Sequence, residues 1–320
     1  MKGFEHYLPK RWHSCSSLTC MARCPFRYFL KVGCRLADTT TAPALVFGSA
    51  IHAGIHLCYT GDVEGATAAW EKIWNEAGLE EDQKRNKYRA QMMFEDFARN
   101  FNEDLCVWKV LPPVGVEIED RVSPHEVAFA VDVGLDVPYV GRIDALVQQI
   151  HTKELWGLEY KTTSGLGDSF LQAFEINPQL CTYTMALRAS TQKPVRGMFL
   201  CAMLVALRKV ETIAYPIFVT DAMVQDAIDW IRWQHHRIRA CEKAQNFPKD
   251  ISGCNTYAGW GVATYNCEFT TLCKDQDWTS MKENYYILPE REFQIKGTLD
   301  EQIVGNAQIT GAATDSGLAE

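Results

Sequence analysis

Residues Tyr139–Ser164, which read YVGRIDALVQQIHTKELWGLEYKTTS, decide how this sequence is interpreted. A single aspartate, Asp144, interrupts an apolar run, and Glu159 and Lys161 follow with one residue between them. Side chains alternate between the two faces of a strand, so Glu159 and Lys161 point the same way. Residues 151–154 have the composition of a turn, which predicts a hairpin that places Asp144 roughly opposite Glu159 and Lys161.

Two carboxylates and an ammonium group on one sheet face form an oxygen-rich site for a hard divalent cation with a positive charge beside it. Metal-assisted hydrolysis of a phosphodiester requires these groups. Short charge patterns are common, however, and a solvated amphipathic hairpin with one chance acid would show the same spacing. The hairpin alone therefore leaves both interpretations open.

Length and composition favour an enzyme-sized unit. The chain has 320 residues, of which 47% are hydrophobic, enough to bury the core of one elaborated domain or two small ones. The longest apolar stretch, Met198–Leu207, is too short for a membrane span and fits a buried strand. The N-terminal sequence MKGFEHYLPKRWHS lacks the apolar core of a signal peptide, so we expect a cytoplasmic protein without membrane contact.

The net charge of −8 argues against a general polyanion-binding surface. A nucleic-acid partner would need a local basic groove instead. Residues 84–89 and residues 230–239 each hold several basic side chains, and the second cluster includes two tryptophans. Such clusters are more often solvated helix faces than binding sites.

The twelve cysteines do not indicate a disulfide framework in a chain that we expect in the cytoplasm. Cys254, Cys267 and Cys273 lie in a segment rich in Gly, Asn, Thr and Tyr that lacks a regular pattern. Irregular backbone with recurrent cysteines fits metal ligation, because a metal supplies cross-links that a core would otherwise provide. Cys20 and Cys24 are further candidate ligands near the other terminus.

The remaining pattern predicts alternating helical and strand-rich regions. We expect helices over residues 18–32, from Phe47 to about Leu111 with breaks near Gly61 and Gly78, after Asn177-Pro178, and over residues 221–245. We expect strands within residues 114–150, and over residues 195–206 and 211–219. The residues beyond Lys296 have the composition of a flexible tail.

Several motifs, in order, resemble those of the PD-(D/E)XK nuclease superfamily, specifically its RecB/AddB-like branch with CRISPR-associated and phage exonucleases that carry an iron–sulfur cluster. The motifs are GSAIH at 48–52, GRID at 141–144, EYK at 159–161 and QLCTY at 179–183. A cysteine before a proline near the N-terminus and three cysteines near the C-terminus complete the set. No single motif is specific, but five features in the expected order over residues 16–275 carry the resemblance.

The resemblance implies a metal site. Asp144 and Glu159 would bind magnesium or manganese, with His52 as a further ligand. The carbonyl group of Tyr160 would complete the inner shell, and Lys161 would orient the attacking water and stabilise charge on the phosphoryl oxygens.

The resemblance also implies roles for residues around that site. Gln179 and Tyr183 are four residues apart and share a helix face, from which they would position the lysine and the scissile strand. His56 would be structural, because the family pattern requires only the first histidine. Glu117 is a candidate for an additional acid beside the metal ligands, with Glu119 and Asp120 as rivals.

By the same resemblance, Cys24, Cys254, Cys267 and Cys273 would hold a [4Fe–4S] cluster that joins the two terminal segments. The relatives usually show C-x2-C-x5-C in the C-terminal group. Here 12 residues separate Cys254 from Cys267, and five separate Cys267 from Cys273. This departure leaves tetrathiolate zinc as an alternative, and Cys20 as an alternative first ligand.

We therefore expect an α/β protein with a restriction-endonuclease-like core and a central mixed sheet. The core would span residues 47–245, with a helical insertion at 53–112. Residues 1–46 and 246–293 would together form the lobe that carries the iron–sulfur cluster, and residues 294–320 would form a flexible tail.

The expected function is metal-dependent cleavage of DNA, exonucleolytic on single-stranded ends, in recombination, repair or CRISPR adaptation. The sequence contains no GxxxxGK[ST] phosphate loop, so a helicase or recombination protein would act in trans. Two other functions stay open. One is a non-catalytic DNA-binding adaptor with an iron–sulfur cluster or zinc, and the other is a metal-dependent hydrolase of small phosphate esters.

Overall fold

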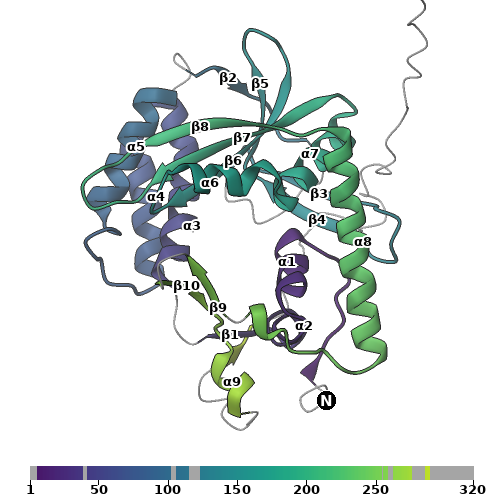
Figure 1. Cartoon of the computed structure of the whole chain (residues 1–320). Helices are drawn as coiled ribbons and strands as arrows, with labels where there is room; N and C mark the ends of the chain where they lie inside the picture. The colour runs from purple at the N-terminus through teal and green to yellow at the C-terminus, as the bar shows by residue number, and fades with distance from the viewer. Residues whose placement is uncertain are drawn as a thin grey trace, which may run out of the picture.

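A five-stranded mixed sheet lies at the centre of the computed structural model (Figure 1), which describes residues 6–38, 42–101, 106–114, 123–253, 255–258, 262–275 and 285–288. The strand order is β2 (Trp108–Val110), β5 (Ala145–Gln149), β6 (Leu155–Thr163), β7 (Val195–Leu204) and β8 (Thr212–Phe218). β6 and β7 are parallel, and the other neighbours are antiparallel. The prediction of an α/β fold with a central mixed sheet is confirmed.

The predicted hairpin is formed by β5 and β6. Residues 150–154 connect the two strands, and Lys153 adopts the left-handed conformation at φ 62°. Ala145 pairs with Leu158, and extending this register by one residue places Asp144 opposite Glu159. The first six residues of β6 are buried because both faces of this strand are covered.

Helices cover both faces of the sheet (Figure 1). On one face, α3 (Pro43–Ile55), α4 (Val63–Glu76) and α5 (Lys87–Phe101) share a hydrophobic core with alternate residues of β6 and β7. On the other face, α7 (Pro178–Thr191) and α8 (Asp221–Lys243) share a second core with the intervening residues. The period-2 alternation of β6 therefore sends Tyr160 toward α3–α5 and Glu159 toward α7.

The predicted long helical region is interrupted where the two glycines stand. Gly61 at φ 79° follows the short 3-10 helix η3 (His56–Thr60), and Gly78 at φ 65° follows α4. Glycine adopts this left-handed conformation without steric cost. The prediction of helix up to about Leu111 is wrong at its end: Trp108 is buried and Lys109 exposed, and residues 108–110 form the edge strand β2. The range 53–112 is therefore not entirely helical.

The N-terminal region contains three short helical segments in place of the single predicted helix over 18–32. They are α1 (Cys15–Arg23), α2 (Pro25–Tyr28) and the π-helical η2 (Phe29–Gly33). The break falls at Cys24, which is extended, because proline disfavours the helical conformation of the residue before it. The residues that follow, for which no strand was predicted, contain β1 (Leu36–Asp38), which pairs with β11 (Tyr285–Ile287).

The smaller elements are two strand pairs and two short helices. β3 (Val127–Val131) pairs with β4 (Tyr139–Ile143), and β9 (Asn255–Ala258) pairs with β10 (Val262–Asn266). The helices are α6 (Asp168–Glu175) and α9 (Thr270–Asp275), and a single 3-10 turn, η4, spans Ile251–Gly253. The predicted tail beyond Lys296 lies outside the described residues.

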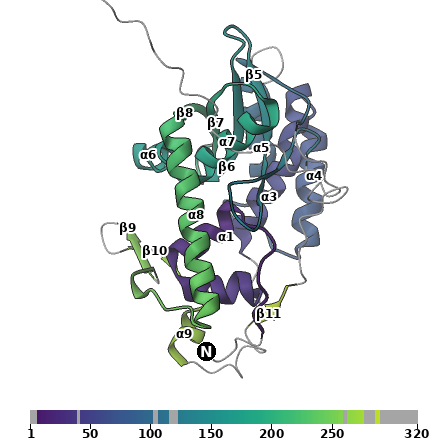
Figure 2. The ribbon, with the colours of Figure 1, turned by 90° about the vertical axis from the view of Figure 1, so that its right-hand side faces the viewer.

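The two ends of the described chain pack against each other (Figures 1 and 2). The Phe26 amide donates to the Pro248 carbonyl at 3.1 Å, and the Phe29 ring lies 5.5 Å from that of Phe247. Arg27 and Lys31 each contact the Glu268 carboxylate at 2.8 Å. Segments from opposite ends of the sequence therefore share one core. Within the described ranges, no helix has both the length and the apolar composition that crossing a membrane requires.

Candidate active site

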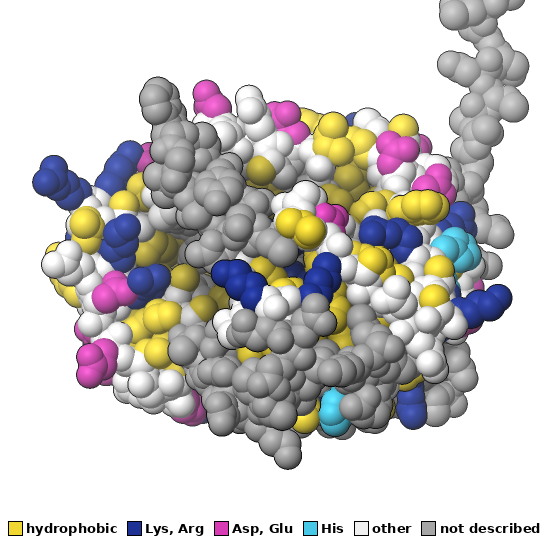
Figure 3. Space-filling view, turned by 60° about the horizontal axis from the view of Figure 1, so that its bottom comes forward, with side chains coloured by type: hydrophobic (Ala, Val, Ile, Leu, Met, Phe, Trp, Pro, Cys, Tyr) yellow, Lys and Arg dark blue, Asp and Glu magenta, His cyan; other side chains and the backbone are white. Residues whose placement is uncertain are grey.

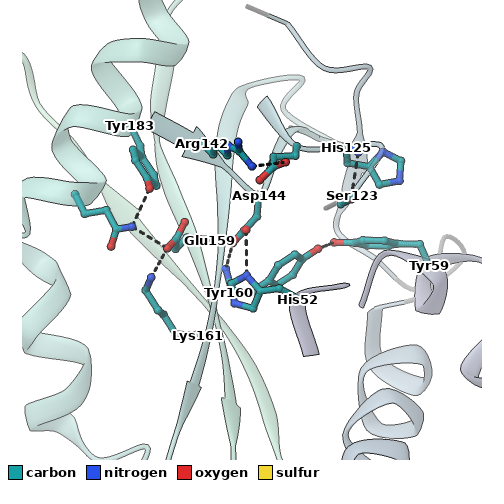
Figure 4. Close-up of polar contacts among 12 residues, drawn as sticks. His52, Tyr59, Ser123, His125, Arg142, Asp144, Glu159, Tyr160, Lys161 and Tyr183 are labelled. Atoms are coloured by element: carbon teal, nitrogen blue, oxygen red, sulfur yellow. Dashed lines mark hydrogen bonds and ion pairs between the residues drawn. The ribbon is translucent and has the colours of Figure 1, made fainter. Parts of the chain in front are cut away.

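Asp144 occupies the single residue between β4 and β5, where the chain bends from the small sheet into the central one. This bend directs its carboxylate back toward β6. The Tyr160 amide donates to Asp144 Oδ2 at 2.6 Å, and His52 Nδ1 of α3 lies 3.3 Å from Asp144 Oδ1 (Figure 4). The structure thus brings these three predicted residues together.

Electrostatic coupling links His52 to Asp144. Burial disfavours the charged imidazole, yet the pKa of His52 is raised, because the Asp144 carboxylate outweighs the desolvation. Burial also disfavours the Asp144 carboxylate, but His52, the Tyr160 amide and Lys161 together lower the pKa of Asp144. Asp144 is therefore ionised at neutral pH.

Glu159 is held by two neighbours on its own side of the sheet (Figure 4). Lys161 Nζ donates to Glu159 Oε1, and Gln179 Nε2 of α7 donates to the same oxygen at 3.2 Å. Gln179 Nε2 also lies 2.9 Å from the Tyr183 hydroxyl, one turn further along α7. The i, i+4 pair predicted for one helix face does share that face, and it contacts Glu159 rather than Lys161.

The position of Gln179 depends on how α7 begins. Asn177 is the N-cap, and its side-chain oxygen accepts a hydrogen bond from the backbone N–H of Gln179 at 2.9 Å. Pro178 occupies the first turn, where its missing N–H is not needed. The predicted helix start is confirmed, and it fixes Gln179 in the first turn beside Glu159.

The two carboxylates influence each other. Burial and the charge of Asp144 raise the pKa of Glu159 to about 7, against the opposing effect of Lys161. Glu159 in turn raises the pKa of Lys161, which overcomes the cost of burying the ammonium group. The buried Glu159 and the half-buried Asp144, whose charges repel, form with Lys161 a site that a divalent cation would stabilise.

The candidate ligand atoms are of the kinds that a hard divalent cation binds. In this structure, however, they contact other protein groups. Asp144 and Glu159 supply carboxylate oxygens and His52 an imidazole nitrogen, but those oxygens contact His52, the Tyr160 amide, Lys161 and Gln179. Across the described ranges, no three His, Cys, Asp or Glu side chains are grouped closely enough to hold a metal ion. The assignment of Asp144, Glu159, His52 and the Tyr160 carbonyl as ligands therefore stays a prediction.

The Tyr160 side chain faces away from the carboxylates. Its hydroxyl lies 2.8 Å from that of Tyr59, in the core beneath α3–α5 (Figure 4). Any contribution of Tyr160 to a metal would thus come from its backbone, as predicted. His56, predicted to be structural, lies away from the carboxylates, with its ring 6.4 Å from that of His125.

Glu126 is an acidic neighbour of the site that sequence reasoning missed. It precedes β3, and the register of β3 with β4 places it opposite Asp144. Glu126 is 8% exposed, and its Oε2 lies 3.9 Å from Arg142 Nη1. The sequence feature that could have identified Glu126 is its position directly before the apolar run VAFAV. The candidates Glu117, Glu119 and Asp120 lie outside the described residues.

The predicted cluster ligands are placed in part. Asp250 N donates to Cys24 Sγ at 3.4 Å, and the adjacent Lys249 Nζ donates to the Cys273 carbonyl at 2.6 Å. Cys267 is buried at the start of the turn that leads into α9. Cys254 lies outside the described residues.

The alternative first ligand also has a contact in this region. Arg27 Nη1 donates to Cys20 Sγ at 3.5 Å, and burial raises the pKa of the Cys20 thiol to about 11.

Comparison with known proteins gives the family. Residues 13–274 match the sequence profile of the PD-(D/E)XK nuclease superfamily. The chain belongs to the PD-(D/E)XK nuclease superfamily. Membership supports a hydrolase that acts as a nuclease, and nucleases of this superfamily generally use divalent metals such as Mg²⁺ or Mn²⁺.

The fold agrees with that membership. A crystal structure from Eubacterium rectale described as "Putative exonuclease" superposes with a TM-score of 0.50 at 14% identity, over 91% of this chain and 93% of that one. At this identity the similarity concerns the fold alone. A search of curated protein sequences finds no match.

Proposed function

We propose that the protein is a metal-dependent deoxyribonuclease that degrades DNA from single-stranded ends. The observation that carries this proposal is the placement of Asp144 opposite Glu159, with Lys161 on the Glu159 carboxylate. A hairpin with one chance acid would not need this arrangement. A non-catalytic adaptor would have no physical need for two neighbouring acids that repel each other and a lysine beside them.

The residues divide the work. When bound, a divalent cation would lower the pKa of a water molecule and offset charge on the phosphodiester. Asp144, Glu159, His52 and the Tyr160 carbonyl would hold the cation, and the Tyr160 backbone N–H, which donates to Asp144 Oδ2, would orient that carboxylate. Lys161 cannot ligate a cation while it is charged, so it would orient water and stabilise negative charge on the phosphoryl oxygens.

Gln179 and Tyr183 would position Glu159. The Gln179 amide group can donate one hydrogen to Glu159 and the other to Tyr183, which fixes the rotamer of the carboxylate relative to Lys161. This contact would keep Glu159 in place if Lys161 turned toward a substrate phosphate. In this proposal both residues act through Glu159.

The exonucleolytic mode and the pathway rest on the resemblance to the RecB/AddB-like branch. The proposed pathways are recombination, repair and CRISPR adaptation. A helicase or recombination protein is the proposed partner for unwinding.

We also propose that Cys24, Cys254, Cys267 and Cys273 bind a [4Fe–4S] cluster, with structural zinc as the alternative. The contacts of the adjacent residues Lys249 and Asp250 with the Cys273 and Cys24 regions support this. A cluster there would close a loop that comprises most of the chain, and it would so stabilise the packing of the two termini.

End-labelled DNA tests the main proposal. Purified protein should shorten single-stranded DNA from its ends with Mn²⁺ or Mg²⁺ and not with EDTA. Lys209→Ala, which removes an exposed lysine that pairs with Glu211 instead of a site carboxylate, is the matched control for Lys161→Ala. Binding of DNA without any cleavage in either metal would favour the adaptor. Hydrolysis of small phosphate esters without cleavage of DNA would favour the third function.

A further inference from the structure

A groove leads away from the candidate active site along the N-terminal segment. It is a cavity of about 920 Å³, bordered at one end by Gln179 and Tyr183 of α7 and by Gly141 and Arg142 of β4. From there it passes along α1 and reaches Lys31 in η2. Gln179 lines the groove and also contacts Glu159, so this end of the groove lies beside the carboxylate site.

The walls of the groove are basic although the protein is acidic. Five cationic side chains line it, namely Lys10, Arg27, Lys31, Arg35 and Arg142. The described residues that border the groove include no Asp or Glu. Two carboxylates outside the groove neighbour three of these cations: Glu268 contacts Arg27 and Lys31, and Glu126 Oε2 lies 3.9 Å from Arg142 Nη1. The five cations still outnumber these two carboxylates. In a chain with a net charge of −8, this local excess favours a polyanion at this position.

The groove also contains two indole rings. Trp12 and Trp230 both line it, and Lys10 Nζ lies 5.0 Å from the centroid of the Trp12 ring. Aromatic rings interleaved with cations are typical of sites for unpaired strands, because an unpaired base can stack on an indole while its phosphate contacts a cation. The bases of a duplex are stacked on each other and cannot do so.

We propose that this groove binds the single strand of DNA that enters the active site, with bases stacked on Trp12 and Trp230 and phosphates beside Lys10 and Lys31. This inference rests on the proposed nuclease function. Lys and Arg side chains lie near the centre of the face drawn in Figure 3, with hydrophobic side chains beside them.

Binding in EDTA tests the groove separately from catalysis. Fluorescence anisotropy of a labelled oligonucleotide should show tighter binding of single-stranded DNA than of a hairpin duplex. Trp12→Ala should weaken single-strand binding about tenfold, within the range measured for loss of one stacked base. The control Trp233→Ala removes an indole that is 63% exposed on α8 and does not line the groove, and it should bind like the wild type.

Salt dependence tests the cations. The double variant Lys10→Gln/Lys31→Gln should reduce the slope of log K against log salt by about 1.4, or about 0.7 for each phosphate that no longer has a cationic partner. Lys84→Gln/Lys209→Gln, which neutralises two exposed lysines outside the groove, should leave the slope unchanged. This measurement stays informative if Trp12→Ala fails to fold.

A small diester distinguishes this inference from the proposed function. Bis(p-nitrophenyl) phosphate is too short to occupy the groove, so the wild type should hydrolyse it with Mn²⁺ whether or not the groove binds DNA. Equal single-strand affinity and salt slope in the groove and control variants would overturn the groove assignment. Equal binding of duplex and single strand by the wild type would overturn the assignment of an unpaired strand. Failure of the wild type to cleave DNA or the diester would contradict the nuclease function instead.

Discussion

Asp144 and Glu159 face each other across the β5–β6 hairpin, and the charge of Asp144 helps to raise the pKa of Glu159 to about 7. The pKa of Asp144 shifts in the opposite direction, because His52 and the Tyr160 amide lower it. The site therefore holds one firmly ionised acid and one acid whose ionisation depends on a nearby cation. A bound metal would favour the charged form of Glu159.

The first prediction concerns Lys161. Lys161→Ala should reduce cleavage of labelled DNA about 100-fold or more, because the variant lacks the positive charge for the phosphoryl oxygens. Single-strand affinity in EDTA should stay near the wild-type value. The control Lys209→Ala should cleave normally, and full Mn²⁺-dependent cleavage by Lys161→Ala would contradict the proposed role of Lys161 in hydrolysis.

A second prediction separates the two histidines of the α3 region. His52 contacts Asp144, whereas the His56 ring lies 6.4 Å from that of His125. His52→Ala should weaken Mn²⁺ binding by at least about 10- to 100-fold. Removal of a residue that only supports a metal ligand already has an effect of this size. His56→Ala should change the unfolding temperature while its metal titration stays unchanged. Indistinguishable titrations for the wild type and His52→Ala would make His52 structural.

The third prediction concerns Glu126. Its carboxylate lies beside Arg142 and opposite Asp144, so its charge adds to the negative potential of the site. Glu126→Gln keeps the shape and removes the charge, and it should weaken Mn²⁺ affinity at least severalfold. Glu154→Gln removes a carboxylate that pairs with Arg196 at the far end of the hairpin, and it should not. Equal Mn²⁺ affinities in these two variants would contradict a role for Glu126.

The fourth prediction is a loss of stability in acid. His13 Nε2 lies 2.9 Å from His235 Nδ1, and His235 also contacts Asp136. Burial, His235 and Arg239 lower the pKa of His13 to about 3, and burial lowers the pKa of His235. The unfolded chain therefore binds these protons first, near pH 6.5. Stability should be complete above that pH and fall toward pH 3, by at most about 1.4 kcal/mol per pH unit for each histidine.

Urea unfolding across this pH range measures the effect. His13→Gln should have a shallower slope below pH 6.5, since one of the two buried imidazoles is gone. His151, an exposed histidine in the hairpin turn, supplies the control His151→Gln, whose slope should match the wild type. An unchanged slope in His13→Gln would show that the histidine pair does not govern acid unfolding.

The hairpin and its register were predictable because all of their determinants are local. Alternation along β6, the turn composition of residues 151–154 and the Asn177-Pro178 helix start each act within a few residues. The opposition of Asp144 and Glu159 follows from these signals together with the tight turn. The break at Cys24 was equally readable from Pro25, although a continuous helix was predicted.

Other features depend on contacts between distant segments. β1, near the N-terminus, pairs with β11 at the other end of the described chain, and neither short strand has a pattern of its own. Likewise, β2 is recognisable as a strand only beside β5. Glu126 lies opposite Asp144 because β3 pairs with β4. Residues 132–138, which connect these strands, do not have the sequence of a tight turn, so this pairing was not predicted. Local propensity cannot supply such pairings.

The last prediction concerns the four cysteines assigned to the cluster. Protein purified without oxygen should be brown and contain iron and labile sulfide. Serine at any of Cys24, Cys254, Cys267 or Cys273 should bleach the protein and lower its solubility, because the two termini would lose their cross-link. Cys58→Ser, at a buried thiol in the core beneath α3–α5, should keep the colour.

Two outcomes would redirect this assignment. Retained colour in Cys24→Ser with lost colour in Cys20→Ser would move the first ligand by one helical turn, toward the thiol that contacts Arg27. Stoichiometric zinc without iron or sulfide would favour the tetrathiolate zinc site. In either case, soluble Cys267→Ser should still bind Mn²⁺, because the carboxylate site is built from β4–β6, α3 and α7 and not from the terminal segments.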